Sequence, residues 1–492
     1  MTDLRRTTLT DLPPTVNVPQ YKTGNTGCAI VHFGVGAFHR AHQAMYLDRI
    51  LTAGHTDWTE CGVGVLAGDA RMRDVLNRQD HLYTLVTVAP DGSRDARVIG
   101  AITDYLFAPD DPQAVIDVLA SPTTRIVSLT ITEAGYGVSD ETGEFEPRDQ
   151  DVLGDLNDLT APASVFGLLT AGLALRRDRG ITPFTVMSCD NIEHNGSVAR
   201  KALTTFAWHH DVDLASWIDQ YVAFPSSMVD RITPATTPAV VADVLGEFAI
   251  DDEWPVRSES FVQWVLEDKF SCGRPPFEDV GVQMVDDVVP YEHMKLRLLN
   301  ASHQVMSYLG VLAGHTHVHE AMADPDLSAF VTSYMRHEAA PTLGPVPGID
   351  VTEYIVQLTE RFSSSALRDT LERQIVDSSA RIPKFIVPVL RDRLARDQSI
   401  EHLALTLAAW CDVYARGTVP MVDGNGDLLR RLSRADRDNP GAFLDNRAVF
   451  AELVDSPRLR RAYQRAKRLL QDLGPRRAAR EVAARCAAQA GA

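Results

Sequence analysis

The chain has 492 residues and a formal net charge of −18, which bounds the classes of protein to which it can belong. A composition that is 45% hydrophobic and 23% charged is typical of a folded globular protein and excludes a fibrous or disordered one. Because this net charge repels phosphate backbones and anionic lipid, we expect neither nucleic acid nor a membrane surface as a partner. The sequence has no apolar signal-peptide core and no run near the ~20 apolar residues of a membrane helix, so we expect a cytoplasmic protein.

The cysteines are scattered singly, without a C-x-x-C pair. This spacing argues against a disulfide framework and against a thiolate zinc site. We therefore expect reduced, mostly buried thiols. They are Cys28, Cys61, Cys189, Cys272, Cys411 and Cys486.

Strand-like and helix-like patterns alternate in the first part of the chain. Residues 28–54 combine an apolar run, a glycine pair and apolar positions at helical spacing, which predicts a strand, a tight turn and a helix. Further short, β-branched runs occur at 61–67, 125–132 and 184–189, with helical patterns between them. This alternation predicts βαβ units and a parallel sheet that is buried on both faces.

Beyond about residue 285 the pattern becomes helical. Amphipathic helices are predicted at 293–313, 351–374, 385–396, 401–415 and 456–488, separated by Pro- and Gly-containing turns. The sequence therefore predicts an α/β domain over residues 1–285, followed by a mostly α-helical domain over residues 286–492.

The segment GVGAFH, residues 34–39, joins two glycines to the start of a predicted helix. Gly34 would allow the tight turn, and Gly36 would let the backbone approach a pyrophosphate held at the helix N-terminus. This is the context that a dinucleotide fingerprint requires. His39 stands in place of the third glycine, so the motif alone also fits a tight turn without a ligand. We take Gly34, Gly36, Phe38 and His39 as candidate cofactor contacts.

Two charged residues are further cofactor candidates. Arg40, in the first helical turn, could pair with a phosphate through its planar fork of donors, and the alternative is a surface salt bridge. Asp69 follows the second predicted strand, where an acid accepts from the adenosine ribose hydroxyls and favours NAD over NADP. The alternative for Asp69 is an N-cap of the following helix, and one carboxylate can serve as both.

The stretch KLRLLNASH, residues 295–303, carries three polar groups that are costly to bury in a helix. On an α-helix Asn300 and His303 share a face, while Lys295 lies about 80° from His303 and about 140° from Asn300. The three side chains can therefore border one pocket. The alternative is a snorkelling lysine, an asparagine at a helix break and a satisfied core histidine.

The chemistry of a nicotinamide-dependent alcohol oxidation suits this trio. Lys295 can remove the hydroxyl proton if burial lowers its pKa from about 10.4 toward neutrality. Asn300 can donate N–H groups to the developing oxyanion, and His303 can orient the substrate or tune the lysine. Glu292, one turn earlier, could pass protons to solvent.

Two other motifs give weaker evidence about the function of the protein. YEHMK (291–295) and YQRAK (463–467) both match the YxxxK spacing of short-chain dehydrogenases, and a pattern that occurs twice carries little information. HTHVHE (315–320) spaces three histidines two apart, which suits a metal only on a strand, whereas its surroundings look helical or turn-like. We therefore expect no metal site.

Several segments, in one order, resemble the polyol-specific long-chain dehydrogenases, the mannitol dehydrogenase family. They are IVHFGVGAFHRAHQA (30–44), RIVSLTITEAGY (125–136), FTVMSCDNIEHNG (184–196), FPSSMVDRITP (224–234), FVQWVLEDKF (261–270) and YEHMKLRLLNASH (291–303). Several motifs in one order are far more specific than any single one. The resemblance extends from residue 18 or so to at least residue 400.

This resemblance implies a Rossmann-type domain followed by a largely helical domain, with NAD as the cofactor and no metal. In the family's KxxxxNxxH pattern, matched by Lys295, Asn300 and His303, the lysine is the catalytic base and the asparagine contributes to an oxyanion hole. Asn191 of the SCDN motif matches a second oxyanion donor, at the carboxyl end of a strand where ligands of open α/β sheets bind.

By the same resemblance, Asp230 and Arg373 contact the polyol. Two positions depart from the family's DGSxK pattern, because Ser378 replaces its glycine and Arg381 its lysine. A guanidinium is larger and differently directed than an ammonium group, so the exchange leaves the choice of polyol open.

The implied reaction is the reversible, NAD-dependent oxidation of D-mannitol to D-fructose by a subunit that is often monomeric in this family. D-Arabinitol and fructuronate are alternative substrates within the family. A uronate needs a cation for its carboxylate, which Arg373, Arg381 or Lys384 could supply. A non-catalytic NAD-binding regulator is a further alternative, against which the lysine and the paired asparagines speak.

Overall fold

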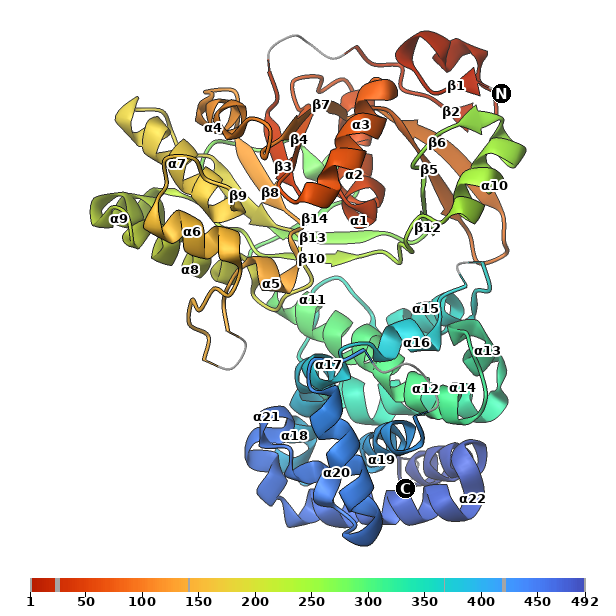
Figure 1. Cartoon of the computed structure of the whole chain (residues 1–492). Helices are drawn as coiled ribbons and strands as arrows, with labels where there is room; N and C mark the ends of the chain where they lie inside the picture. Colours follow the sequence, from red (N-terminus) through yellow and green to blue (C-terminus); the bar gives the residue numbers. More distant parts are fainter. Residues whose placement is uncertain (1, 23–26, 140–141, 367, 418–421, 491–492) are drawn as a thin grey trace. The chain divides into compact units, whose positions relative to one another are not determined.

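The computed structural model divides into two compact units (Figure 1). Unit 1 comprises Met1–Ala89 with Ser93–Val288, and unit 2 comprises Val289–Ala492 with Pro90–Gly92. Within the described part of the chain, no helix is both long and apolar enough to cross a membrane. The residues that the structure describes are 2–22, 27–139, 142–366, 368–417 and 422–490.

Unit 1 is built on a five-stranded sheet in the order β7–β4–β3–β8–β9, and all four pairings are parallel. The strands are β3 (Ile30–Phe33), β4 (Glu60–Gly64), β7 (Ile102–Phe107), β8 (Ile126–Leu129) and β9 (Thr185–Ser188). Counted along the chain this order is 3-2-1-4-5, the Rossmann arrangement, and the strand order reverses between β3 and β8. The predicted α/β class with a parallel sheet is confirmed. In such sheets ligands bind beyond the carboxyl ends of the strands at this reversal.

Helices cover both faces of this sheet (Figure 1). One group is α1 (Ala37–Ala41), α2 (Gln43–Thr52) and α3 (Ala70–Arg78), and the other is α4 (Pro112–Ala120), α7 (Val165–Asp178) and α8 (Asn195–Trp208). Successive residues of β3 serve the two cores, since Ile30 packs in the first group and Val31 and Phe33 in the second. Burial on both faces explains why these strands appear as continuous apolar runs.

Smaller sheets that the sequence analysis did not single out complete unit 1. In sheet order they are β12 (Val256–Glu259), β5 (Tyr83–Val88), β6 (Arg94–Ile99) and β2 (Val16–Asn17); β10 (Ser227–Asp230), β13 (Gln263–Glu267) and β14 (Gln283–Val285); and β1 (Thr2–Asp3) with β11 (Ile250–Asp251). The β5–β6 and β10–β13 pairs are antiparallel. Unit 1 is therefore a mixed structure around a parallel centre.

Unit 2 is built from helices. They are α11 (Val289–Met294), α12 (Ala301–Leu312), α13 (Val318–Ala323), α14 (Pro325–Tyr334), α15 (Val351–Ser363), α16 (Leu371–Ile375), α17 (Ser378–Phe385), α18 (Val387–Ala395), α19 (Glu401–Arg416), α20 (Gly426–Asp438), α21 (Arg447–Phe450) and α22 (Pro457–Ala490). Helix α19 is buried along most of its length, as expected for a helix that is apolar on nearly all sides. Its Trp410 ring contacts the rings of Tyr308 and Phe443. The predicted helical domain is confirmed, although the single helix expected at 351–374 is divided into α15 and α16.

Two segments of unit 2 are π-helical turns: η4 (Lys295–Asn300) and η5 (Met335–Ala339). Each ends with an i→i+5 hydrogen bond, from Ala301 N–H to the Leu296 carbonyl and from Ala340 N–H to the Met335 carbonyl. The helix predicted at 293–313 is therefore not a regular α-helix. Such widened turns are rare and frequently occur at functional sites.

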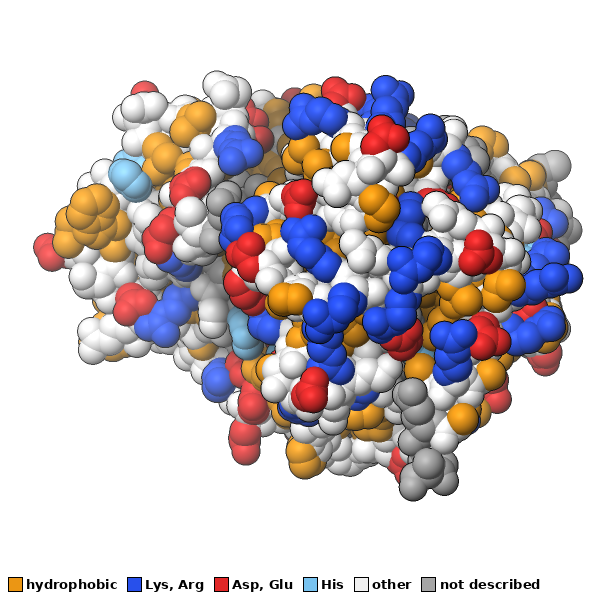
Figure 2. Space-filling model, turned by 90° about the horizontal axis from the view of Figure 1, so that it is seen from below, with side chains coloured by type: hydrophobic (Ala, Val, Ile, Leu, Met, Phe, Trp, Pro, Cys, Tyr) orange, Lys and Arg blue, Asp and Glu red, His pale blue; other side chains and the backbone are white. Residues whose placement is uncertain are grey.

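Basic side chains gather beside acidic ones on one face of the molecule (Figure 2). In α22, arginines form ion pairs with acids of other segments. The pairs include Arg458–Asp397, Arg460–Asp445, Arg465–Glu401, Arg476–Asp324 and Arg480–Asp326. These pairs neutralise arginines that the sequence alone presents as a basic tail.

A buried ion pair holds the N-terminus of α19. The Glu338 carboxylate, on η5, accepts hydrogen bonds from the backbone N–H groups of His402 (2.9 Å) and Leu403 (3.1 Å), and His402 Nδ1 lies 3.0 Å from the same carboxylate. A negative charge is favourable at a helix N-terminus. Burial lowers the pKa of His402, but the charge of Glu338 outweighs burial and raises this pKa to about 9.

This raised pKa predicts a loss of stability at alkaline pH. In the unfolded chain the His402 pKa is about 6.5, so its protonation stabilises the fold fully below pH 6.5, and this contribution is lost as pH rises through about 9. The contribution is on the order of 3 kcal/mol. We expect the free energy of urea unfolding of unit 2 to differ between the wild type and His402→Gln. This difference should be largest at the lower pH and should shrink as the pH rises and His402 loses its proton. A difference that is independent of pH would rule out a charged His402.

Candidate functional site

The glycine turn lies at the reversal of the strand order in unit 1. Gly34 follows β3 and has φ of +94°, a conformation that favours glycine. A Cβ atom at Gly34 would lie 2.1 Å from the carbonyl oxygen of Thr130, the residue after β8. Gly36 is the N-cap of α1, and only the Gly34 carbonyl lies within 4 Å of its Cβ position. The turn is therefore tight at Gly34 and open at Gly36.

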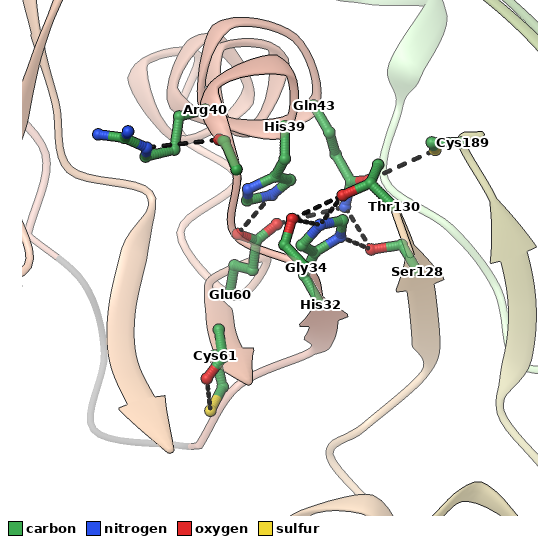
Figure 3. Close-up of polar contacts among 12 residues, drawn as sticks. His32, Gly34, His39, Arg40, Gln43, Glu60, Cys61, Ser128, Thr130 and Cys189 are labelled. Atoms are coloured by element: carbon green, nitrogen blue, oxygen red, sulfur yellow. Dashed lines mark hydrogen bonds and ion pairs between the residues drawn. The ribbon is translucent and has the colours of Figure 1, made fainter. Parts of the chain in front are cut away.

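A chain of buried hydrogen bonds holds this turn on its interior side (Figure 3). The Thr130 hydroxyl donates to the Gly34 carbonyl (2.6 Å), and His32 Nε2 lies 2.9 Å from the Thr130 oxygen. On the other side of the ring, His32 Nδ1 lies 2.8 Å from the Ser128 hydroxyl, which accepts from the Gln43 amide (2.8 Å). This pattern is consistent for a neutral His32 that carries its proton on Nε2. Burial favours that state by lowering the pKa of His32 well below its usual value.

His39, which replaces the third glycine, points into this buried network. Its ring stacks on His32 with centroids 3.5 Å apart, and its Nε2 lies 2.9 Å from a carboxylate oxygen of Glu60 (Figure 3). Burial lowers the pKa of His39 to about 3 and raises that of Glu60 to about 7. His39 is therefore neutral and supports the turn from the interior, while its predicted contact with the cofactor stays a prediction.

Arg40 is buried, so the alternative of a surface salt bridge is wrong. Its guanidinium donates to the Trp254 carbonyl (2.5 Å) and lies over the rings of Tyr83 and Trp254. The Tyr83 hydroxyl donates to the Arg40 carbonyl (2.6 Å). Phe38, partly buried, stacks on His42 with centroids 5.0 Å apart. These contacts anchor α1, and a phosphate contact for Arg40 remains a hypothesis.

Asp69 lies at the end of the short 3-10 turn η2 (Ala67–Asp69), which follows β4. One carboxylate oxygen, Oδ2, accepts from the backbone N–H groups of Val65 (3.0 Å) and Leu66 (2.9 Å). Asp69 occupies the N-cap position of α3, as the alternative expects, but its side chain makes no capping hydrogen bond to that helix. Among the described residues, Oδ1 has no hydrogen-bond partner.

These features fit a dinucleotide. The open Gly36 lies at a helix N-terminus, where backbone N–H groups favour a pyrophosphate. The remaining oxygen of Asp69, at the end of the next strand, can accept from ribose hydroxyls. The described part of unit 1 thus offers both groups that such a cofactor requires.

Asn191 lies in an exposed bend immediately after β9. Its neighbour Asp190 is largely buried and accepts from the Tyr136 hydroxyl (2.8 Å) and from two backbone N–H groups of the segment after β8 (2.9 Å each). The Asn195 amide donates to the Asp190 carbonyl (3.0 Å) and to the Ser227 carbonyl (2.8 Å). The bend that carries Asn191 is therefore fixed by Asp190 and Asn195, two residues of the FTVMSCDNIEHNG segment whose structural role no local pattern indicates.

Asp230 is the last residue of β10 and is buried. It lies opposite Gln263 of β13 in the antiparallel register. The Asn195 side chain bonds both the carbonyl and the N–H of Ser227, the first residue of β10. Unit 1 thus ties the segments that carry Asn191 and Asp230 to one another.

The predicted polar helix of unit 2 has a different geometry from an α-helix. Lys295 is the first and Asn300 the last residue of the π-helical turn η4. An i→i+5 turn holds somewhat less than one residue more than an α-helical turn, so five residues end about 50° past a full turn. This is a correction to the α-helical estimate of about 140°, because the widened turn brings Lys295 and Asn300 toward one face. Lys295 is buried.

The neighbouring polar residues lie on the flanking α-helices. His303 is in α12, and its ring lies 4.7 Å from that of Phe362 on α15. Glu292 is in α11, one turn before Lys295. Tyr291, of the YxxxK match, donates its hydroxyl to the Pro347 carbonyl (2.8 Å).

Arg373 is bound to a carboxylate of its own unit. Its Nε and Nη2 atoms donate to the two oxygens of Asp369, each at 2.7 Å, and the Gln374 amide donates to Asp369 Oδ2 at 2.8 Å. Burial would raise the pKa of Asp369, but Arg373 outweighs burial and holds this pKa below its usual value. The charge of Arg373 is thus balanced by Asp369, a partner that no sequence motif indicates.

The two departures from the family pattern have distinct environments. Arg381 Nη1 donates to the carbonyls of Gln374 (3.0 Å) and Arg373 (3.3 Å). The buried Ser378 hydroxyl lies 2.9 Å from the Tyr414 hydroxyl and donates to Asp423 (2.8 Å), and it accepts from the Trp410 indole (3.0 Å). Ser378 is therefore accommodated by hydrogen bonds within the helical core.

Two of the three histidines of HTHVHE pair with acids near α13. His315 Nε2 lies 3.2 Å from Asp324, and His317 Nδ1 lies 3.1 Å from Glu320. A separate buried group, Glu338, His402 and Cys486, has potential metal ligands within 4.8 Å of one another. Hydrogen bonds from the α19 N-terminus and from His402 already engage both oxygens of Glu338, so this group is accounted for without an ion.

Two family models and several named relatives match most of the chain. Residues 28–279 match the model of the mannitol dehydrogenase Rossmann domain, and residues 287–470 match that of the mannitol dehydrogenase C-terminal domain. The chain is 44% identical over 450 residues to mannitol 2-dehydrogenase of Aspergillus fumigatus (89% of each chain) and 43% identical over 444 residues to that of Phaeosphaeria nodorum (89% of this chain, 78% of the relative).

Two solved structures also resemble the chain over nearly its whole length. The ternary complex of Pseudomonas fluorescens mannitol 2-dehydrogenase with NAD and D-mannitol has a TM-score of 0.89 and 44% identity, covering 98% of this chain and 99% of that one. A substrate-free D-sorbitol dehydrogenase has a TM-score of 0.89 and 36% identity, covering 97% and 99%.

Gly34→Ala should impair cofactor binding. The positive φ alone costs about 1–2 kcal/mol for an alanine, and the Cβ atom would force Thr130 away from the turn. We expect the dissociation constant for NADH, measured by fluorescence titration, to rise at least about 10-fold. Gly246→Ala is the matched control, since no atom lies within 4 Å of its Cβ position. Equal NADH affinity in both variants would contradict the assigned turn.

Proposed function

Because the chain belongs to the mannitol dehydrogenase family, we propose that it is an NAD-dependent mannitol 2-dehydrogenase that interconverts D-mannitol and D-fructose. The observation that carries this proposal is the 44% identity over 98% of the chain to the enzyme whose structure contains NAD and D-mannitol. The Gly34 turn and Asp69 supply the cofactor groups. When bound, NAD accepts the hydride from the alcohol carbon.

In this proposal Lys295 removes the proton from the reacting hydroxyl. Asn300, on the same widened turn, and Asn191, beyond β9, donate N–H groups to the oxygen as it becomes a carbonyl. His303 orients the substrate, and Glu292 passes the proton from Lys295 to solvent. No step in this scheme requires a metal.

The charges around the proposed polyol contacts favour a neutral substrate. Arg373 reaches the substrate as half of an ion pair, since Asp369 takes its Nε–Nη2 edge. A uronate carboxylate would therefore meet a guanidinium whose charge is already balanced and whose Nε–Nη2 edge is already occupied. Asp230 adds a further negative charge that suits hydroxyl groups as hydrogen-bond donors and repels a carboxylate. These features support a polyol over fructuronate.

A substrate panel tests the proposal directly. Initial rates of NADH formation should be highest with D-mannitol, compared with sorbitol and D-arabinitol, and NADH oxidation should be faster with fructose than with fructuronate. Rates should be unchanged by a metal chelator. A clear preference for D-arabinitol or fructuronate would contradict the proposed substrate, and an absence of turnover with every compound would favour a binding protein.

Lys295→Ala should remove most turnover, by about 10²- to 10⁴-fold, without weakening NADH binding. Oxidation by the wild type should speed up with rising pH because the base must be unprotonated, and reduction should prefer a lower pH range because the same amine must donate a proton. Lys201→Ala is a matched control, since Lys201 forms a surface pair with Glu144. Near-normal turnover of Lys295→Ala, or identical pH profiles in both directions, would show that another group is the base.

A further inference from the structure

The widened turn η4 needs support, because an ordinary α-helix is the default for a sequence such as KLRLLNASH. In α-helical register Lys295 and Asn300 would lie about 140° apart, and in the π-helical register about 50° apart. Two registers of one helix therefore differ mainly in whether these two side chains point the same way. Contacts with other segments must select the wider register of η4.

Arg297 lies in the middle of η4 and is held at both its backbone and its side chain. Its carbonyl oxygen accepts a hydrogen bond from the Tyr334 hydroxyl at 3.1 Å. Its guanidinium donates through Nη1 to Asp392 on α18 (2.6 Å) and to the Thr342 carbonyl (3.0 Å). The guanidinium is mostly buried, so these bonds are shielded from solvent. Arg297 therefore ties the turn to three neighbouring segments.

Tyr334 is itself rigidly placed. It is fully buried as the last residue of α14, directly before the second π-helical turn η5. Glu338 on η5 is bound to the N-terminus of α19 and to His402, whose ring lies 6.5 Å from that of Tyr334. Burial raises the pKa of Tyr334 well above its usual value, so its hydroxyl stays protonated and can donate. The position of this donor is thus set by the core of unit 2.

We propose that Tyr334 is a positioning residue, whose hydroxyl acts together with the Arg297–Asp392 pair to hold η4 in the register that aligns Lys295 with Asn300. Tyr334 would touch neither substrate nor cofactor. This inference rests on the proposed function, since it assumes that Lys295 is the base and Asn300 an oxyanion donor. Its expected effect is on the chemical step and not on binding, because misplacement of reacting groups by about 1 Å can cost 10²-fold in rate.

Tyr334→Phe tests this proposal by removing one hydroxyl and keeping the ring. We expect kcat per NADH-binding site to fall about 10-fold, while the KM for D-mannitol and the dissociation constant for NADH stay within about 2-fold of the wild type. The deuterium isotope effect with D-mannitol labelled at the reacting carbon should be at least as large as in the wild type. Counting NADH-binding sites removes any contribution from unfolded protein.

Tyr463→Phe is the matched control. Tyr463 is also a fully buried tyrosine of unit 2, and its hydroxyl donates to Asp436 (3.0 Å), away from η4. It loses a bond to a charged group and should lose at least as much stability as Tyr334→Phe. We expect its kcat per binding site to be unchanged.

Asp392→Asn gives a second test at a side chain that is about one-third exposed, in case Tyr334→Phe does not fold. It should lower kcat per site in the same way, by about 3-fold or more, again without raising KM. If both variants keep the kcat of the wild type, or if Tyr463→Phe lowers kcat per site as much as they do, the positioning role is wrong. Failure of the proposed function is distinguishable, because it would appear as high turnover in Lys295→Ala.

Discussion

The close approach of β3 and β8 at the reversal of strand order is the constraint on which unit 1 depends. It leaves no room for a side chain at Gly34, whose Cβ atom would lie 2.1 Å from the Thr130 carbonyl. Since the Thr130 N–H donates to the Phe33 carbonyl and the Thr130 hydroxyl donates to the Gly34 carbonyl, the backbone can leave β3 only by the observed turn. The helix N-terminus that follows is thereby placed where a pyrophosphate can bind.

Buried polar residues, and not only apolar packing, determine how this turn is held. Gln43, Ser128, His32 and Thr130 form a chain in which each donor has an acceptor. A satisfied network of this kind rigidifies a site, because every alternative arrangement leaves a buried polar group unpaired. In unit 2 the same principle applies at η4, where a tyrosine hydroxyl and an arginine side chain bind the widened turn. Both halves of an NAD-dependent polyol dehydrogenase are thus held by hydrogen bonds outside the reacting groups.

Much of the fold could be predicted from the sequence. The strands β3, β4, β8 and β9 are short apolar runs, and α19 is a long pattern with clear ends, so local periodicity suffices to find them. The β10–β13 pair joins strands that are far apart along the chain, so no local pattern connects them. The β5–β6 hairpin is local, but its strands pair outward with β12 and β2, which are distant in the sequence. The family was recognised from motifs in a fixed order, and the matches over residues 28–279 and 287–470 confirm it.

The sequence by itself determined the class of fold, the family and the residue types available for chemistry, because these depend on local pattern and on motifs. Tertiary structure alone decided how those residues are used. It turned His39 and Arg40 inward, paired Arg373 with Asp369, and widened the turn between Lys295 and Asn300. The physical reason is that a buried charge or a non-standard helical turn is tolerated only when specific partners satisfy it. Those partners, such as Trp254 and Tyr334, come from segments that no local pattern connects.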